Sequence, residues 1–208
     1  MNIAIVDYGM GNLHSAYKAV QKVALNARVE LVDTPEKIQA ADRIILPGQG
    51  AIAACMAAIR SKHLLAALKD AAKNKPFLGI CIGPQLMSCH STENNGVDGI
   101  GLLDCETVRF NPDGEDCGEK IKIPQMGWNQ IKQNREHFLW NGISDNSFFY
   151  FVHSYHLTDN DFSIGTCSYG ETFPAAVAKD NIAGLQAHPE KSGENGLRFL
   201  ANFVAWQP

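Results

Sequence analysis

A short apolar segment, residues 76–80, runs directly into a cysteine that has a glycine two residues before it and another two residues after it. The segment is typical of a buried parallel strand, and the residues after Cys81 are typical of a helix start. The resulting pattern, G-x-C-x-G, is the thiol counterpart of the G-x-S-x-G nucleophile elbow, which needs small neighbours at a sharp turn. A small buried cysteine between two turn glycines would give the same string, so the motif alone leaves both interpretations open.

The residues before this motif alternate between strand-like and helix-like patterns. Strands are expected at residues 2–7, 29–32 and 43–46, and helices at 13–23, from 34–36 onward, at 52–59 and at 63–73. This order predicts an α/β fold with a mostly parallel, doubly wound sheet and helices on both faces.

After the motif the pattern changes to short strands separated by turns. Strand-like runs lie at residues 106–110, 129–132, 148–152, 163–168, 175–178 and 182–185, and turns at 94–96 and 111–114. They predict an antiparallel extension of the same sheet in the C-terminal half. Residues 193–206 are expected to form a closing helix whose core stripe is Leu197, Leu200, Phe203 and Val204. We expect one domain over residues 1–208.

Composition excludes several classes of function. The net charge is −4 and lysines and arginines do not cluster, which argues against nucleic-acid and membrane-surface binding. We expect no signal peptide and no membrane span, because the first residues lack a basic segment and apolar runs are short. Six scattered cysteines without a C-x-x-C predict reduced thiols in a cytoplasmic protein, with Cys117 in a polar loop. Neither cysteine nor histidine shows ligand spacing, so we expect no metal and no cofactor.

A thiol nucleophile needs a base, and the base needs a group that orients it. His188 lies in Gln186-Ala187-His188-Pro189-Glu190, just after the last expected strand. In an extended segment His188 and Glu190 would project from the same side, which predicts a Cys81-His188-Glu190 triad. His153 and His156 follow an apolar run and are further residues that could face the site. His14, His63, His90 and His137 are expected to be ordinary polar residues.

Two backbone segments are candidate oxyanion donors. One is the N–H of Ile82, immediately after the cysteine, and the other is the loop Gly48-Gln49-Gly50 after the third strand. Two glycines around one residue let a backbone turn its N–H groups inward. Most such loops are only turns, so this segment is weak evidence by itself.

Together these motifs resemble the class I, or triad, glutamine amidotransferases. Further segments narrow the resemblance to the glutaminase subunits of imidazole glycerol phosphate synthase, from histidine biosynthesis. They are residues 7–13 (DYGMGNL), 125–129 (QMGWN), 150–155 (YFVHSY) and 188–192 (HPEKS), and the resemblance covers essentially the whole chain. The family implies that L-glutamine is the substrate and that ammonia passes to a separate cyclase subunit, a (β/α)₈ barrel. The two subunits would form a heterodimer.

The resemblance also implies roles for individual residues. Cys81 attacks the side-chain amide of L-glutamine, His188 transfers protons and Glu190 orients His188. Gln85 and the backbone at Ser154 and Tyr155 match the positions that hold the amino-acid end of glutamine. The face toward the cyclase is formed by Asn12, Trp128, Tyr150 and Lys191.

The sequence departs from the family pattern at two positions. Pro84 stands where methionine usually precedes the glutamine, and Ala187 stands where an aromatic residue is common before the histidine. We expect the triad to survive both, with the shape of the glutamine pocket affected. Other interpretations are a subunit of a paralogous pathway, a stand-alone cysteine peptidase or γ-glutamyl hydrolase on the same fold, and a non-catalytic module. The presence of Cys81, His188 and Glu190 argues against the last.

Overall fold

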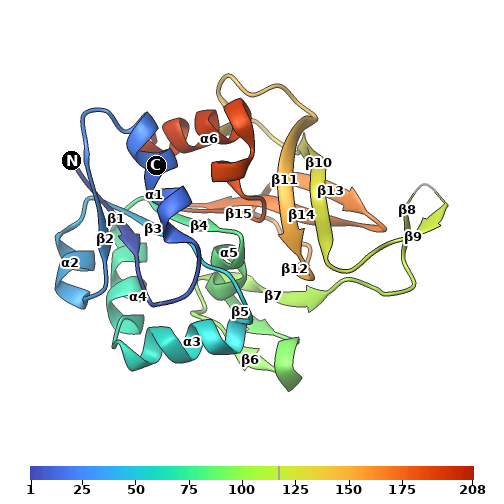
Figure 1. Cartoon of the computed structure of the whole chain (residues 1–208), viewed down its shortest axis with the longest axis horizontal. Helices are drawn as coiled ribbons and strands as arrows, with labels where there is room; N and C mark the ends of the chain where they lie inside the picture. Colours follow the sequence, from blue (N-terminus) through green and yellow to red (C-terminus); the bar gives the residue numbers. More distant parts are fainter. Residues whose placement is uncertain (117) are drawn as a thin grey trace.

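The parallel half of the sheet confirms the predicted α/β fold. The computed structural model describes residues 1–116 and 118–208, so the predicted loop position of Cys117 lies outside the described residues. Nine described strands form one sheet in the order β11-β10-β13-β14-β15-β4-β3-β1-β2 (Figure 1). Five of them run parallel: β2 (Arg28–Val32), β1 (Asn2–Val6), β3 (Arg43–Leu46), β4 (Phe77–Ile80) and β15 (Ile182–Leu185).

The other half of the sheet is antiparallel, as predicted, but residues 182–185, which were expected in it, form β15, which pairs parallel with β4. The antiparallel half begins where β14 pairs antiparallel with β15 and continues outward through β13 and β10 to the edge strand β11. The four strands are β14 (Glu171–Lys179), β13 (Ser163–Tyr169), β10 (Gln125–Gln133) and β11 (Ser147–His153).

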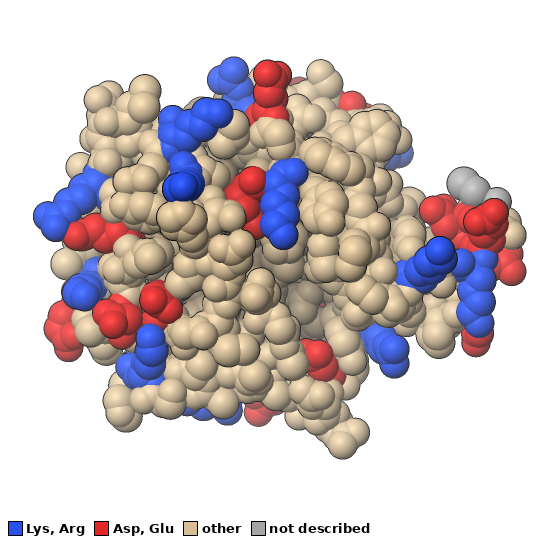
Figure 2. Space-filling model, in the orientation of Figure 1, with Lys and Arg blue, Asp and Glu red and all other residues tan. Residues whose placement is uncertain are grey.

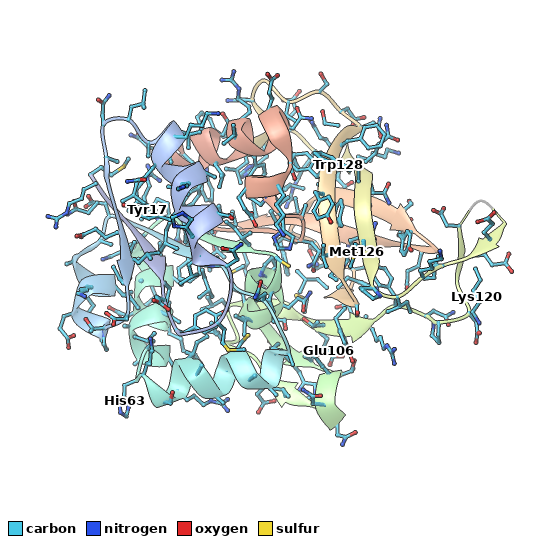
Figure 3. All side chains as sticks on the ribbon, in the orientation of Figure 1. Tyr17, His63, Glu106, Lys120, Met126 and Trp128 are labelled. Atoms are coloured by element: carbon cyan, nitrogen blue, oxygen red, sulfur yellow. The ribbon has the colours of Figure 1, made fainter. Side chains whose placement is uncertain are left out.

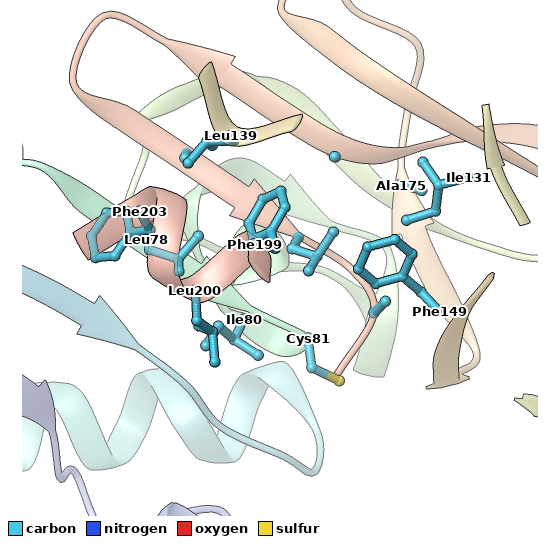
Figure 4. Close-up of a cluster of buried hydrophobic side chains, with 14 of the residues drawn as sticks. Leu78, Ile80, Cys81, Ile131, Leu139, Phe149, Ala175, Phe199, Leu200 and Phe203 are labelled. Carbon is cyan, nitrogen blue, oxygen red and sulfur yellow. The ribbon is translucent and has the colours of Figure 1, made fainter. Parts of the chain in front are cut away.

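Helices cover both faces of the sheet, and each face has its own apolar core (Figure 1). One layer holds α1 (Leu13–Val23) and α6 (Gly193–Ala205), which pack against each other. The other layer holds α2 (Pro35–Ala40), α3 (Ile52–Ser61), α4 (Leu65–Asn74) and α5 (Ile82–Met87). Figure 4 shows the first core, where Phe199, Leu200 and Phe203 of α6 lie over Leu78 and Ile80 and the cluster reaches Cys81. The apolar packing therefore extends to the end of β4, where Cys81 follows.

One predicted strand belongs to a different sheet. Residues 106–110 were expected in the extension, but they fall largely in β7 (Leu103–Arg109), which lies in a separate four-stranded sheet. Its order is β12-β7-β5-β6, with β12 (Tyr155–Leu157), β5 (Ser88–Ser91) and β6 (Val97–Asp98). Alternation of buried and exposed residues predicts a strand but does not specify its neighbours. The remaining short elements are β8 (Glu115–Asp116), β9 (Glu119–Lys120) and the 3₁₀ helices η1 (Glu93–Asn95), η2 (Phe138–Trp140) and η3 (Pro189–Lys191).

Two helix predictions need correction. The helix expected at 63–73 begins at Leu65, because His63 has a φ of +56°, which separates α3 from α4. The buried stripe of α6 includes Phe199, which the predicted stripe omitted, while Leu197 and Val204 are only partly buried at its margins. The face that packs on the sheet is thus rotated relative to the predicted one.

Two further observations concern the environment of the protein. In the part of the chain that the structure describes, no helix is long and apolar enough to cross a bilayer. The five described cysteines are free thiols.

Candidate active site

The turn at Cys81 has the backbone geometry of a nucleophile elbow. Cys81 has φ +58° and ψ −95°, a combination that side chains rarely adopt and that is often found at functional sites. The flanking glycines have a steric reason. A Cβ on Gly79 would lie 2.7 Å from the backbone of Gly83, and a Cβ on Gly83 would lie 2.3 Å from the carbonyl oxygen of Leu46. The close approach of β4, α5 and β3 therefore requires glycine on both sides of the cysteine.

Both departures from the family pattern are accommodated by packing. Pro84 is buried in the first turn of α5, where a Cβ on Gly184 of β15 would lie 3.0 Å from its ring. A proline N–H is not needed in the first helical turn. Ala187 is fully buried in the core beneath α6.

His188 and Glu190 meet as the sequence predicts, but through a different backbone geometry. The His188 Nδ1 lies 2.7 Å from Glu190 Oε1, and both side chains are largely buried. The segment is not extended: Pro189 begins the 3₁₀ helix η3, and His188 is its N-terminal cap residue. The pairing is produced by this tight turn, so the side-chain alternation expected of a strand is not its cause.

The charge state of His188 follows from its neighbours. Burial opposes a charged imidazole, but hydrogen bonds to Cys81 and Glu190, with the negative charge of both, outweigh it and raise the pKa of His188 to about 10. With Nδ1 held by Glu190, Nε2 is the nitrogen that faces the thiol. The protonated imidazole beside Cys81 supplies the positive charge and the proton that attack by the sulfur and departure of a leaving group require.

Strand β11 contacts both Cys81 and His188 and so supports their relative positions. The backbone N–H of His188 donates to the carbonyl of Tyr150 at 2.8 Å. The Cys81 Sγ lies 3.8 Å from the carbonyl oxygen of Val152, two residues further along the same strand. Ser192 completes the support, since its hydroxyl donates to the His188 carbonyl at 2.6 Å and accepts from the Tyr150 N–H at 3.0 Å.

A pocket of about 380 Å³ opens beside the thiol. Ten of the residues singled out from the sequence border it: Cys81, His188, Gln49, Gly50, Ile82, Gln85, Ser154, Tyr155, His153 and Lys191. Gly48 lies one step behind, with its Cα against the Tyr8 hydroxyl, and Glu190 lies behind the imidazole. The pocket is large enough for an amino acid and places it between the thiol and the loop of Gln49 and Gly50.

The orientation of Gln85 is fixed by a residue that sequence reasoning missed. Gln186 Nε2 donates to the Cys81 carbonyl at 3.0 Å, and its Oε1 accepts from Gln85 Nε2 at 3.0 Å. Gln85 Nε2 also donates to the Tyr155 carbonyl at 2.8 Å. Both amide hydrogens of Gln85 are thereby used, so its side chain offers the pocket an acceptor, Oε1. The place of Gln186 beside the His188 motif was the only signal in the sequence.

Glu93 is a second pocket residue that the sequence did not indicate. It borders the pocket from η1, and its Oε2 accepts from the Ile52 N–H at the start of α3, at 2.8 Å. The turn prediction at residues 94–96 brought no attention to it. A carboxylate at this place can attract a positively charged ligand group.

Lys191, which borders the pocket, links the predicted partner-facing residues. Trp128 is 55% exposed and packs edge-on against Tyr150, with 5.9 Å between the two ring centres. The Lys191 ammonium lies 5.9 Å from the centre of the Tyr150 ring. Asn12 borders a small cavity together with Lys191. Met126, which the sequence analysis did not single out, is 66% exposed on the same strand as Trp128 (Figure 3). The surface over β10 and β11 carries few charged side chains (Figure 2).

The other histidines fall into a buried group and a group that is at least partly exposed. His153 borders the pocket and is buried, whereas His156 packs between Phe110 and Phe173 away from the thiol. The four histidines expected to be ordinary polar residues are exposed or partly exposed: His14, His63, His90 and His137.

Comparison with known proteins identifies the class. The sequence matches the protein family described as glutamine amidotransferase class-I over residues 4–206. The chain therefore belongs to the class I glutamine amidotransferases and is an enzyme of that type. PurLQS from Thermotoga maritima has a similar fold, with a TM-score of 0.71 at 17% sequence identity, covering 98% of this chain and 97% of that one.

Two curated relatives define the position within that class. The imidazole glycerol phosphate synthase subunit HisH of Dechloromonas aromatica (strain RCB) is 47% identical over 211 residues, covering 99% of this chain and 97% of the relative. The subunit of the same name from Aromatoleum aromaticum is 46% identical over 212 residues, covering 100% and 99%. The chain belongs to the family of these HisH subunits.

Proposed function

We propose that this chain is the glutaminase subunit of an imidazole glycerol phosphate synthase and that Cys81, His188 and Glu190 are its catalytic triad. The observation that carries the proposal is the strained Cys81 turn, with the imidazole of His188 hydrogen-bonded between the thiol and Glu190 at the edge of an amino-acid-sized pocket. The role follows that of the HisH relatives, which are named as subunits of this synthase.

The first half of the reaction breaks the amide bond. The Cys81 thiolate attacks the side-chain carbonyl carbon of L-glutamine, and the carbonyl oxygen becomes an oxyanion. Backbone N–H groups of Ile82 and of the loop with Gln49 and Gly50 stabilise that charge. The His188 imidazolium gives its proton to the amide nitrogen, the carbon–nitrogen bond breaks, and ammonia leaves a glutamyl thioester on Cys81.

The second half releases glutamate. Neutral His188 takes a proton from water, and the resulting hydroxide attacks the thioester carbonyl. The carbon–sulfur bond breaks, and the Cys81 thiolate is restored beside the protonated imidazole. Glu190 holds the imidazole in one orientation through both halves, at 2.7 Å from Nδ1. Glutamine and water are thus converted to glutamate and ammonia.

Substrate recognition follows from charges at the far end of the pocket. The α-ammonium group of glutamine needs acceptors, and Gln85 Oε1 and the Glu93 carboxylate are suited to it. The backbone at Ser154 and Tyr155 borders the same end and holds the α-carboxylate. We expect Glu93→Gln to raise the KM for glutamine more than it lowers kcat.

The ammonia passes to a cyclase subunit, which binds to the surface beside the pocket. An exposed aromatic next to exposed Met126 and a cation above Tyr150 resemble the anchors of protein interfaces, since Trp and Tyr dominate binding energy there. We propose that Trp128, Tyr150, Lys191 and Asn12 contact the cyclase in a heterodimer. The partner would use the ammonia to make imidazole glycerol phosphate and an aminoimidazole carboxamide ribonucleotide.

The described free thiols support a cytoplasmic location.

Release of glutamate from L-glutamine tests this function. The chain is assayed alone, with the cyclase subunit, and with the cyclase plus its ribonucleotide ligand, next to a Cys81→Ala control. We expect a large rise with the loaded partner that is absent in the control. Full activity without a partner would indicate a stand-alone hydrolase. Unchanged activity of Cys81→Ala would refute the assignment of the catalytic triad.

A further inference from the structure

A continuous chain of buried and partly buried hydrogen bonds leads from the nucleophile to β10, the strand that carries Trp128. It begins at the Cys81 carbonyl and passes through the amides of Gln186 and Gln85 to the carbonyl of Tyr155. The Tyr155 oxygen lies 2.8 Å from a second group, His153 Nδ1. The proposed function uses the first part of this chain but gives no role to His153.

The hydrogen on Nδ1 of His153 is required by chemistry. A backbone carbonyl only accepts hydrogen bonds, so the bond to Tyr155 needs a proton on Nδ1. The other ring nitrogen, Nε2, lies 2.8 Å from the side-chain amide of Gln125. If the amide oxygen faced the ring, Nε2 would also need a proton, and the ring would be a cation.

The surroundings of the ring disfavour a cation. Aromatic rings of Phe110, Phe151 and Phe173 lie 5.1, 5.6 and 5.2 Å from it, centre to centre. Burial lowers the pKa of His153 to about 3, with the bond to Tyr155 opposing the shift and the charges of His156 and His188 adding to it. A neutral ring has one proton, already placed on Nδ1, so Nε2 must accept.

The neutral ring determines the orientation of Gln125. The two ends of an amide have nearly the same shape, and hydrogen bonding decides which end faces a neighbour. Gln125 therefore turns its NH₂ group toward His153 Nε2, and its oxygen faces the Cys167 thiol, which lies 3.9 Å from the other end of the amide. The N–H on His153 Nδ1 then meets the Tyr155 carbonyl, and one N–H of Gln125 meets His153 Nε2.

The last member of the chain begins the partner-facing strand. Gln125 is the first residue of β10 and pairs directly with His153 across β10 and β11. The next residues on that strand include the exposed Met126 and Trp128. A displacement of the start of β10 would therefore act on His153 through one hydrogen bond and on the Tyr155 carbonyl through a second.

We propose that His153 is a positioning residue: as a neutral, Nδ1-protonated imidazole that accepts from Gln125, it holds the Tyr155 carbonyl that orients Gln85 and so ties glutamine binding to the position of β10. The inference rests on the proposed function for its substrate, but its tautomer is a property of the chain alone. The tautomer assignment and the effect on binding are tested separately.

The tautomer is measured by ¹⁵N NMR of the histidine side chains in the wild-type chain. We expect His153 to carry its proton on Nδ1 and to remain neutral from pH 5 to pH 8. The Gln125→Glu variant should convert His153 to the imidazolium, because a carboxylate accepts but does not donate. A proton on Nε2 of the wild-type ring, or an imidazolium within that pH range, would overturn the assignment whether or not the chain hydrolyses glutamine.

The positioning role is measured as the Kd for L-glutamine in a Cys81→Ala background, which cannot turn over, and as the KM with the loaded partner. His153→Gln is compared with His156→Gln, a matched change of a buried histidine that packs on the same rings of Phe110 and Phe173. We expect His153→Gln to weaken glutamine binding by roughly 3- to 10-fold, the value of one neutral hydrogen bond.

The comparison separates positioning from a general loss of structure. His156→Gln should leave the Kd and KM for glutamine within about twofold of wild type, and kcat should change less than KM in His153→Gln. Equal weakening by both substitutions, or no weakening by His153→Gln, would overturn the positioning role. If glutamine does not bind to the background protein at all, the proposed function fails while the tautomer measurement still stands.

Discussion

Replacing Glu190 by glutamine converts one buried carboxylate to an amide and tests the hydrogen bond between Glu190 and His188. In the wild type, Glu190 Oε1 lies 2.7 Å from His188 Nδ1, and the carboxylate is 7% exposed. Glutamine has almost the same shape, so the substitution removes the charge while preserving the packing. Depending on which end of the amide faces the ring, it accepts from Nδ1–H or donates to Nδ1.

The two orientations of the new amide bound the expected loss. If its oxygen faces Nδ1, a charged hydrogen bond of about 1.5–3 kcal/mol is replaced by a neutral one of about 0.5–1.5 kcal/mol, a loss of about 1–1.5 kcal/mol, or about 5- to 13-fold in rate. If its nitrogen faces Nδ1, the proton moves to Nε2, where it blocks removal of the Cys81 proton. A reversed tautomer in a serine-protease triad costs about 10⁴-fold in kcat. We expect kcat for Glu190→Gln to fall by between about 5-fold and about 10⁴-fold.

The assay is glutamate release at saturating L-glutamine with the loaded partner present. The KM should change little, because Glu190 lies behind the imidazole and does not border the glutamine pocket. Glu194→Gln, the same substitution at an exposed position of α6, is the matched control and should behave as wild type. A kcat for Glu190→Gln within about threefold of wild type would refute the assigned role of the His188–Glu190 bond.

Three further outcomes follow from the same structure. Because the pKa of His188 is raised in the folded state, the protonated imidazole stabilises the fold fully below pH 6.5, and this contribution is lost as the pH rises toward about 10. Denaturant titrations should therefore show the unfolding free energy falling over that range, and the fall should be smaller in His188→Gln. A Cβ at Gly48 would lie 1.7 Å from the Tyr8 hydroxyl oxygen, so Gly48→Ala should lower the unfolding free energy by about 1–3 kcal/mol, and adding Tyr8→Phe should recover part of it. Trp128→Ala should weaken cyclase binding by about 30-fold in calorimetry, with a loss of stability of no more than about 1 kcal/mol. Unchanged affinity of Trp128→Ala for the cyclase would refute the assignment of Trp128 to the interface.

The local patterns of the sequence predicted the parallel half of the fold well. Buried runs such as residues 43–46 contain enough β-branched residues to specify strands, and α1 has the predicted bounds, 13–23. The sequence did not predict which sheet a strand joins, because partners such as β5 and β12 are short and half-polar. Placement of β7 depends on tertiary pairing with those strands, which periodicity does not encode.

The candidate site shows the same division. The proximity of Cys81, His188 and Glu190 was predictable because each lies in a compact motif with a chemical reason for its spacing. Gln186 and Glu93 were not, because their roles depend on contacts across 101 residues to Gln85 and 41 residues to Ile52. Isolated polar residues give no periodic signal, and only the folded chain brings their side chains to the pocket.

The most direct test of the central claim is detection of the covalent intermediate. The chain is mixed with L-glutamine and the loaded cyclase, quenched in acid within a turnover, digested and examined by mass spectrometry. The account predicts one glutamyl group on the peptide that contains Cys81, and no such group in Cys81→Ala. Glutamine turnover by Cys81→Ala at the wild-type rate, or a glutamyl group on another cysteine, would contradict it.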